Sequence, residues 1–204
     1  MNLKNLNRNF FLLLSLFVSF LLFIFIVLFF VFSNLNAPLK SKIILGQPFS
    51  LTTHEEIEIT DKIFLQKPSI MFFGFTHCPE VCPTTLYEIS TWLNKLEKNS
   101  DKVQAIFITL DPKRDTAKFL NEYLSNFDDM FIGITGSEDE IISLAKSWGV
   151  YRKIIYLEDD EYSIDHTATV FLVNKDGSLN GTITYREPFD VALAKIKNLL
   201  NTNK

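Results

Sequence analysis

The stretch FFGFTHCPEVCPTTLYEIS, residues 72–90, joins a strand pattern to a helix pattern and holds both cysteines of the chain. It begins inside SIMFFGF, residues 69–75, a continuous apolar run that is typical of a central strand buried on both faces. Beyond the second cysteine, apolar residues recur at helical spacing, which predicts an amphipathic helix over 83–98. Cys78 and Cys82 are therefore expected between the end of a buried strand and the start of a helix.

This position favours reactive thiols. The free N–H groups and the dipole at a helix N-terminus stabilise a thiolate relative to a thiol. The spacing of Cys78 and Cys82 fits a disulfide, which needs a Cα separation of about 4.4–6.8 Å. It also fits two ligands of one metal ion, with metal–sulfur bonds of about 2.3 Å. The spacing is compatible with a disulfide and with a metal site, so a third residue is needed to distinguish them.

Strand and helix patterns alternate through the rest of the chain. The segment FSLTTHEEIEIT predicts an edge hairpin, and residues 175–177 form the predicted turn of a second hairpin between TVFLVN and GTITY. Further strands are predicted at 103–110 and 130–135, and further helices at 116–126, 137–148 and 188–201. Strand, helix, strand, helix, hairpin and helix is the order of a thioredoxin-like α/β sheet.

The N-terminal segment has a different character. The run from Phe10 to Phe32 is apolar except for Ser15 and Ser19. As a helix it would be roughly 34 Å long, enough to cross a hydrocarbon core of about 30 Å. A cleaved signal usually has an apolar region of only about 7–15 residues, so we predict an uncleaved membrane anchor.

The flanking charges and the composition set the domain organisation. Lys4 and Arg8 precede the apolar run and predict a cytoplasmic N-terminus. We therefore expect a cytoplasmic tip and transmembrane anchor at 1–36 and one exported domain at 37–204, which is long enough for its own core. The net charge of −4 gives no sign of the basic patch that nucleic acid requires.

His166 is the candidate third ligand. It stands in SIDHTATVFLV, in a loop expected just before a strand and across from the cysteine loop. A hydrogen-bonded structural histidine is the main alternative. His77 is interpreted as a solvated neighbour of Cys78, and His54 as a surface turn residue. Two thiolates and one imidazole favour copper, because structural zinc would normally take a fourth protein ligand.

The exported domain resembles the SCO/SenC family, membrane-anchored copper-binding factors for the assembly of cytochrome c oxidase. The resemblance lies in PFSLTTHEE, FFGFTHCPEVCP, FITLDPKRDT, FIGITGSEDEI and IDHTATVFLVNKDG. It implies a thioredoxin-like α/β fold with an inserted β-hairpin, and it implies that Cys78, Cys82 and His166 are the copper ligands. Asp111, in the Asp-Pro motif at a strand end, would support the site, and a strand-terminating turn residue is the equal alternative.

The leading hypothesis is a copper chaperone that binds Cu(I) or Cu(II) and passes it to the dinuclear copper site of cytochrome c oxidase subunit II. Cys78 and Cys82 would also form a redox disulfide, and that oxidised form could not bind copper. The rival is a thiol–disulfide oxidoreductase that reduces the cysteines of the copper acceptor. A third alternative is an anchored binding domain with an inert disulfide, which the reactive setting of the thiols disfavours.

The predicted location is a bacterial inner membrane, with the C-terminal domain in the periplasm. The N-terminus lacks the Arg- and Ser-rich presequence that mitochondrial import requires. The alternative is a mitochondrial inner membrane, with the domain facing the intermembrane space.

Overall fold

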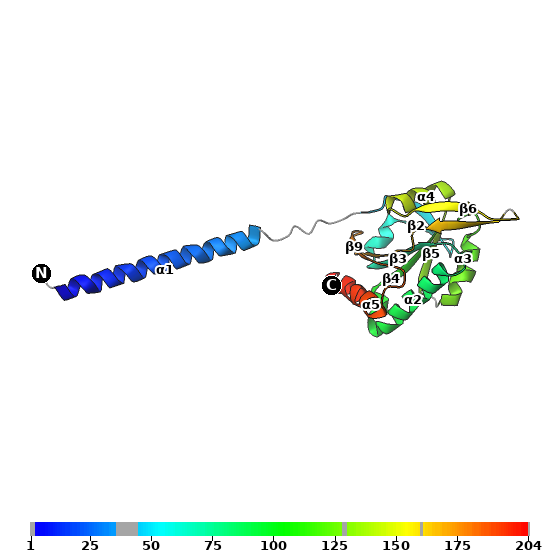
Figure 1. Ribbon diagram of the computed structural model, residues 1–204. Coiled ribbons are helices and arrows are strands. Elements are labelled where there is room, and N and C mark those ends of the chain that lie inside the picture. The colour runs from blue at the N-terminus through cyan, green and yellow to red at the C-terminus, as the bar shows by residue number, and fades with distance from the viewer. Residues whose placement is uncertain (1–2, 36–44, 128–129, 160, 204) are drawn as a thin grey trace. The chain divides into compact units, whose positions relative to one another are not determined.

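The computed structural model describes residues 3–35, 45–127, 130–159 and 161–203 (Figure 1). The chain falls into two compact units, Met1–Ser41 and Lys42–Lys204, and each is described by itself. The predicted domain boundary after residue 36 and most of the linker expected before residue 49 lie outside the described residues.

The N-terminal unit is one long helix, α1 (Leu3–Leu35). Within it, Leu12–Phe30 has a mean hydropathy of 3.1. At about 1.5 Å per residue, a helix of 33 residues is roughly 50 Å long. By length and composition it could cross a membrane.

The C-terminal unit alternates strands and helices. Its strands are β1 (Ser50–Thr53), β2 (Glu58–Thr60), β3 (Ser69–Gly74), β4 (Gln104–Thr109), β5 (Phe131–Thr135), β6 (Arg152–Tyr156), β7 (Tyr162–His166), β8 (Val170–Val173) and β9 (Leu179–Ile183). Its helices are α2 (Val81–Lys95), α3 (Ala117–Leu124), α4 (Glu138–Ser147) and α5 (Phe189–Thr202), with 3₁₀ turns η1 (Asp61–Leu65), η2 (Glu97–Lys102) and η3 (Ser125–Phe127).

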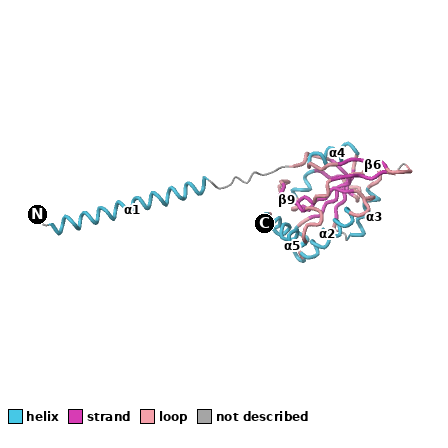
Figure 2. The backbone as a smooth tube through the Cα atoms, in the orientation of Figure 1, coloured by secondary structure: helices cyan, strands magenta, loops and turns pink. Residues whose placement is uncertain are grey.

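Seven strands form one mixed sheet in the order β2-β1-β5-β4-β3-β8-β9. The central strands β3, β4 and β5 are parallel, and β1 and β8 flank them in antiparallel pairing. The sheet lies among helices in Figure 2, so the α/β class predicted from the sequence is confirmed. The predicted edge hairpin is β1 paired with β2, and the second predicted hairpin is β8 paired with β9.

The sheet has a hydrophobic core on each face. Successive side chains of a strand point to opposite faces, so Ile70 and Phe72 of β3 enter one core and Met71 and Phe73 enter the other. Helices α2, α3 and α5 bury apolar residues in the first core, and α4 does so in the second. Each fully buried Ile, Phe or Met contributes about 1.5–3 kcal/mol, so β3 is firmly fixed.

A separate antiparallel ribbon, β6 and β7, lies between α4 and β8 in the chain. Its register runs from Arg152 opposite His166 to Tyr156 opposite Tyr162. The residue patterns predicted no strands here. The expectation that His166 sits in a loop is therefore wrong, because it is the last residue of β7. Pairing with β6 holds the segment extended, so Tyr162, Ile164 and His166 lie on one face of the strand and Ser163 and Asp165 on the other.

Candidate metal centre

The thiols lie between the end of β3 and the first turn of α2. The helix begins at Val81, two residues before the predicted start, so Cys82 is in its first turn. Cys82 is fully buried and Cys78 is partly exposed, and both are free cysteines. A Cβ at Gly74 would lie 2.9 Å from the Cys82 sulfur and 2.8 Å from the Phe107 ring. Glycine is therefore required there, because any other side chain would displace the thiol.

The two sulfurs and the imidazole of His166 converge. The Cys82 sulfur lies 3.5 Å from Nε2 of His166, and the Cys82 backbone N–H donates to the Cys78 sulfur over 3.4 Å. The three candidate ligand atoms all lie within 4.8 Å of one another, and no other set of three such side chains is this close in the described part of the chain. Atoms bound to one ion at about 2.0–2.3 Å lie roughly 3.5–4.5 Å apart, so only small shifts would be needed to share an ion.

The imidazole is oriented with a free lone pair toward the thiols. Its Nδ1 lies 2.9 Å from the carbonyl oxygen of Thr167, and because a carbonyl only accepts, Nδ1 carries the proton. Nε2 is then the unprotonated nitrogen of the neutral ring, and it faces Cys82. The rings of Phe72 and Phe75 flank the imidazole at centroid distances of 6.2 and 5.7 Å. These rings cover part of the imidazole surface.

The thiols have opposite acid–base character. The hydrogen bond from the Cys82 thiol lowers the pKa of the Cys78 thiol to about 4; partial burial opposes this shift, and hydrogen bonds from the Cys82 and Glu80 backbone add to it. The pKa of Cys82 is raised by the same hydrogen bond to Cys78 and by its burial. The pair therefore carries one thiolate, on the partly exposed Cys78, and one thiol.

A buried carboxylate fixes the chain just before Cys78. Asp115 accepts hydrogen bonds from the Thr76 backbone N–H at 3.1 Å, from the Thr76 hydroxyl at 2.5 Å and from the Thr109 hydroxyl at 2.6 Å. Burial raises the pKa of Asp115, against these hydrogen bonds, which lower it. Sequence reasoning missed this contact because Thr76 and Asp115 are 39 residues apart.

Asp111 lies two residues after the end of β4 and is almost fully buried. Its carboxylate accepts from the side chains of Arg114 and Tyr162. The link from Asp111 to the site therefore runs through the ribbon that carries His166. The supporting role predicted for Asp111 stays a prediction.

The other two histidines lie apart from this centre. His77 stacks on Phe119 with ring centroids 5.6 Å apart, and its side chain is 43% exposed. His54 accepts the Gly133 backbone N–H at its Nδ1 over 3.0 Å, so it extends the pairing of β1 with β5.

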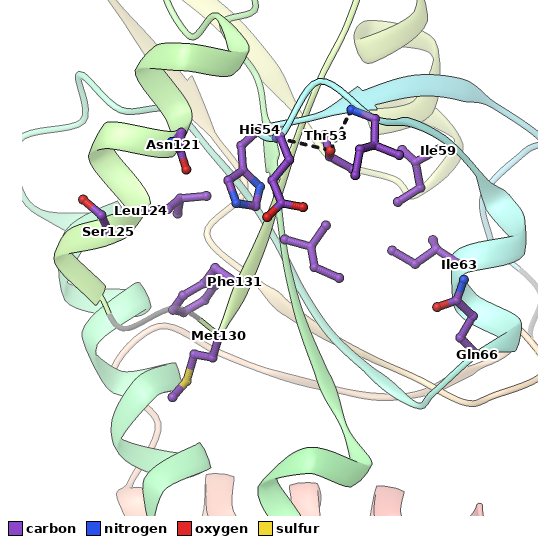
Figure 3. Close-up of a pocket in the computed structure, with 13 residues that line it drawn as sticks. Thr53, His54, Ile59, Ile63, Gln66, Asn121, Leu124, Ser125, Met130 and Phe131 are labelled. Atoms are coloured by element: carbon purple, nitrogen blue, oxygen red, sulfur yellow. Dashed lines mark hydrogen bonds between the residues drawn. The ribbon is translucent and has the colours of Figure 1, made fainter.

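His54 also lines a pocket of about 440 Å³ between the β1–β2 hairpin, α3 and the start of β5, shown in Figure 3. This pocket lies toward the N-terminal ends of the parallel strands, whereas the thiols follow the C-terminal end of β3.

Comparisons with known proteins agree with this architecture. The sequence profile of the SCO1/SenC family matches residues 37–201. Protein SCO1 homolog 1, mitochondrial, of Arabidopsis thaliana is 38% identical over 142 residues, which cover 69% of this chain and 42% of that protein. The structure of Bradyrhizobium japonicum ScoI with copper bound is 41% identical, with a TM-score of 0.71, and the match covers 76% of this chain and 99% of that one.

A more distant solved structure is BsSco, described as a member of the Sco family of cytochrome c oxidase assembly proteins with a disulfide switch. It is 22% identical, with a TM-score of 0.62, and the match covers 80% of this chain and 98% of that one. At this identity the likeness shows the fold alone. The matches to Sco structures confirm the predicted thioredoxin-like fold with an inserted hairpin. The chain spans less than half the length of several mitochondrial relatives it matches.

Proposed function

The chain belongs to the SCO1/SenC family, and from that premise we propose that it is a copper chaperone for cytochrome c oxidase assembly. It binds copper through Cys78, Cys82 and His166 and delivers it to the dinuclear copper site of oxidase subunit II. The observation that carries the proposal is the convergence of two sulfurs and one unprotonated imidazole nitrogen within 4.8 Å. The copper-bound ScoI of Bradyrhizobium japonicum, at 41% identity, supports the choice of metal.

The donor set suits a cargo ion that must be released. Two sulfurs and one imidazole form a soft, three-coordinate set, which favours copper over structural zinc. The Cys78 thiolate is ready to bind, and only the Cys82 proton must leave when copper enters. Because Cys78 is partly exposed, an acceptor thiolate can approach from its side and displace the three ligands in turn.

The N-terminal helix supports a location at a membrane. We propose that residues 1–36 anchor the protein and that residues 37–204 form the copper-binding domain on the far side of the membrane. Lys4 and Arg8 favour a cytoplasmic N-terminus. An anchor raises the effective concentration of donor and acceptor in the same membrane without adding contacts between them. A bacterial inner membrane with a periplasmic domain is the location we propose.

The asymmetry of the thiols also favours a second function, reduction of the acceptor's disulfide. The Cys78 thiolate would attack one acceptor sulfur, form a mixed disulfide and release the other sulfur as a thiolate, which takes up a proton. Cys82 would then lose its proton and attack the Cys78 sulfur, which frees the acceptor dithiol and leaves a Cys78–Cys82 disulfide. An external dithiol must reduce that disulfide before the protein can act again.

One substitution separates the two functions. In the reduced full-length protein in detergent, His166→Ala should lower Cu(I) affinity about a hundredfold, or about 3 kcal/mol, in competition with a chromogenic chelator. Reduction of a model disulfide should remain within about twofold of the unsubstituted protein, because both thiols stay in place. His54→Ala is the matched control and should change neither value. Unchanged copper affinity in His166→Ala would show that the ligand assignment is wrong.

A further inference from the structure

One loop, residues 110–116, contacts the chain on both sides of the candidate centre. On the thiol side, Asp115 holds Thr76 through its backbone N–H and its hydroxyl, two residues before Cys78. The loop is itself fixed to the sheet at both ends. At its start the Leu110 N–H donates to the Gly74 carbonyl of β3. Near its end the Asp115 carbonyl accepts from the Thr135 hydroxyl of β5. The loop therefore has a defined position relative to the thiols.

On the imidazole side, the same loop holds both strands of the ribbon. The Tyr162 hydroxyl donates to the Asp111 carboxylate over 2.8 Å, and Arg114 Nη1 donates to the Tyr162 carbonyl over 3.0 Å. The guanidinium of Arg114 also lies 3.7 Å from the centre of the Tyr162 ring. On β6, Arg152 Nε donates to the Leu110 carbonyl over 2.7 Å. We call Asp111, Arg114 and Tyr162 the latch.

The latch is connected to the imidazole by strand geometry. Residues two apart on a strand share a face, so Tyr162, Ile164 and His166 all point from β7 toward the domain. Ile164 is 4% exposed and enters the core between the two polar ends of the strand, so the three side chains share one packed face. A change in the position of Tyr162 is therefore transmitted along β7 to His166.

The composition of the latch indicates a role in geometry rather than in stability. Asp111 and Arg114 form a charge pair whose side chains are 1% and 19% exposed, and the Arg114 Nη2 atom has no hydrogen-bond partner among the described residues. Removing such charges from water costs several kcal/mol, and apolar residues would hold the ribbon at least as strongly. Directional hydrogen bonds instead define where the strand lies.

We propose that loop 110–116 sets the separation between the thiols and the imidazole, and that Tyr162 is a positioning residue for copper binding. This proposal rests on the proposed function, since it takes His166 as a copper ligand. Asp115 fixes the thiol side of the centre, and the latch fixes the imidazole side. Neither Tyr162 nor Arg114 needs to touch the metal.

A double-mutant cycle tests the proposal in the reduced full-length protein in detergent. Tyr162→Phe removes one hydroxyl and keeps the ring that packs under Arg114. It should lower Cu(I) affinity about tenfold, the low end of the loss expected when a group that orients a metal ligand is removed. In the His166→Ala background the same change should alter the affinity by less than about twofold, because Tyr162 acts through the imidazole.

Tyr156→Phe is the matched control. Tyr156 lies directly opposite Tyr162 in the ribbon, and its side chain is 79% exposed. This variant should bind copper like the unsubstituted protein. Arg114→Gln tests the proposal independently, because it changes the side chain that donates to the Tyr162 carbonyl. Its Cu(I) affinity should also fall about tenfold, again only while His166 is present.

Each other result overturns the proposal in a recognisable way. An equal loss for Tyr162→Phe with and without His166 means that the latch acts on overall structure. No loss in the presence of His166 means that the latch does not position the ligand, while the copper-chaperone proposal stands. If His166→Ala itself leaves the affinity unchanged, both proposals fail together.

Discussion

The thiols are held by the main sheet, whereas the imidazole is held by a ribbon outside it. Every residue of β3 is buried, and the strand pairs with β4 on one side and β8 on the other. By contrast, β6 and β7 pair with each other in a two-stranded sheet, and most residues of β6 are exposed. An isolated two-stranded hairpin is marginally stable in water, so the ribbon depends on its contacts with the domain.

This difference suits the proposed copper chaperone, which would bind the metal in order to release it. The thiol side should open only with global unfolding, whereas the ribbon can open locally at lower cost. Release of copper could then begin with withdrawal of the imidazole. Substitutions on the thiol side are therefore expected to loosen the whole domain. Substitutions in the ribbon are expected to loosen the ribbon alone.

The largest effect is expected from Gly74→Ala on the thiol side. The new methyl group would overlap the Cys82 sulfur and the Phe107 ring. We expect the free energy of unfolding to fall by about 3 kcal/mol and the melting temperature to fall by roughly 6–12 °C. Gly181→Ala is the control, because a Cβ there meets nothing within 4 Å. Equal melting temperatures for the two variants would contradict the tight packing around Cys82.

A smaller and more local effect is expected from Ile164→Ala in the ribbon. Loss of this buried side chain should cost about 2 kcal/mol, chiefly as easier opening of the ribbon. Amide hydrogen exchange in β6 and β7 should therefore accelerate about 30-fold, with little change in β3. Ile155→Ala, at a position that is 38% exposed, serves as the control. Faster exchange throughout the sheet would show that ribbon and sheet open as one unit.

A third change tests the anchor of the cysteine loop. Asp115→Asn replaces one acceptor oxygen by a donor that faces the Thr76 and Thr109 groups. We expect a loss of about 1–2 kcal/mol in chemical denaturation. Asp101→Asn, at an exposed position in η2, should change stability by less than about 0.5 kcal/mol. If Asp115→Asn leaves the free energy of unfolding unchanged, Asp115 does not hold the cysteine loop in place.

The smallest change is expected in the pH dependence of thiol alkylation. Because the pKa of Cys78 is lowered to about 4, its thiolate is already formed throughout the neutral range. The rate of alkylation of the reduced protein by iodoacetamide should vary by less than about twofold from pH 6 to 8, and it should fall as the pH approaches 4. An ordinary thiol, with a pKa of about 8.5, would react roughly 80-fold faster at pH 8 than at pH 6. That steeper profile would argue against a stabilised thiolate.

The sequence predicts the main sheet well because its signals are local. The apolar run at 69–75 and the spacing beyond Cys82 mark β3 and α2 directly, although the helix begins two residues earlier than expected. The thiol side of the centre could therefore be located from one short stretch. Contacts such as Thr76 with Asp115 leave no local signal, because either residue could occupy an ordinary turn.

The ribbon could not be predicted from residue patterns in the same way. Its strands are short and Ile164 is the only buried residue in them, so hydrophobic alternation is weak, and the acidic run at 158–161 looks like a solvated loop. The approach of His166 to the thiols was expected from the topology and from the family resemblance, since Cys82 and His166 are 84 residues apart. Only a tertiary arrangement can bring such residues together.

X-ray absorption spectroscopy of the copper-loaded, reduced full-length protein tests the central claim most directly. The account predicts two sulfur scatterers at about 2.3 Å and one imidazole nitrogen at about 2.0 Å from the copper. In His166→Ala the imidazole signal should disappear while both sulfurs remain. An unchanged imidazole signal in that variant, or a single sulfur in the unsubstituted protein, would contradict the assignment of Cys78, Cys82 and His166 to one copper ion.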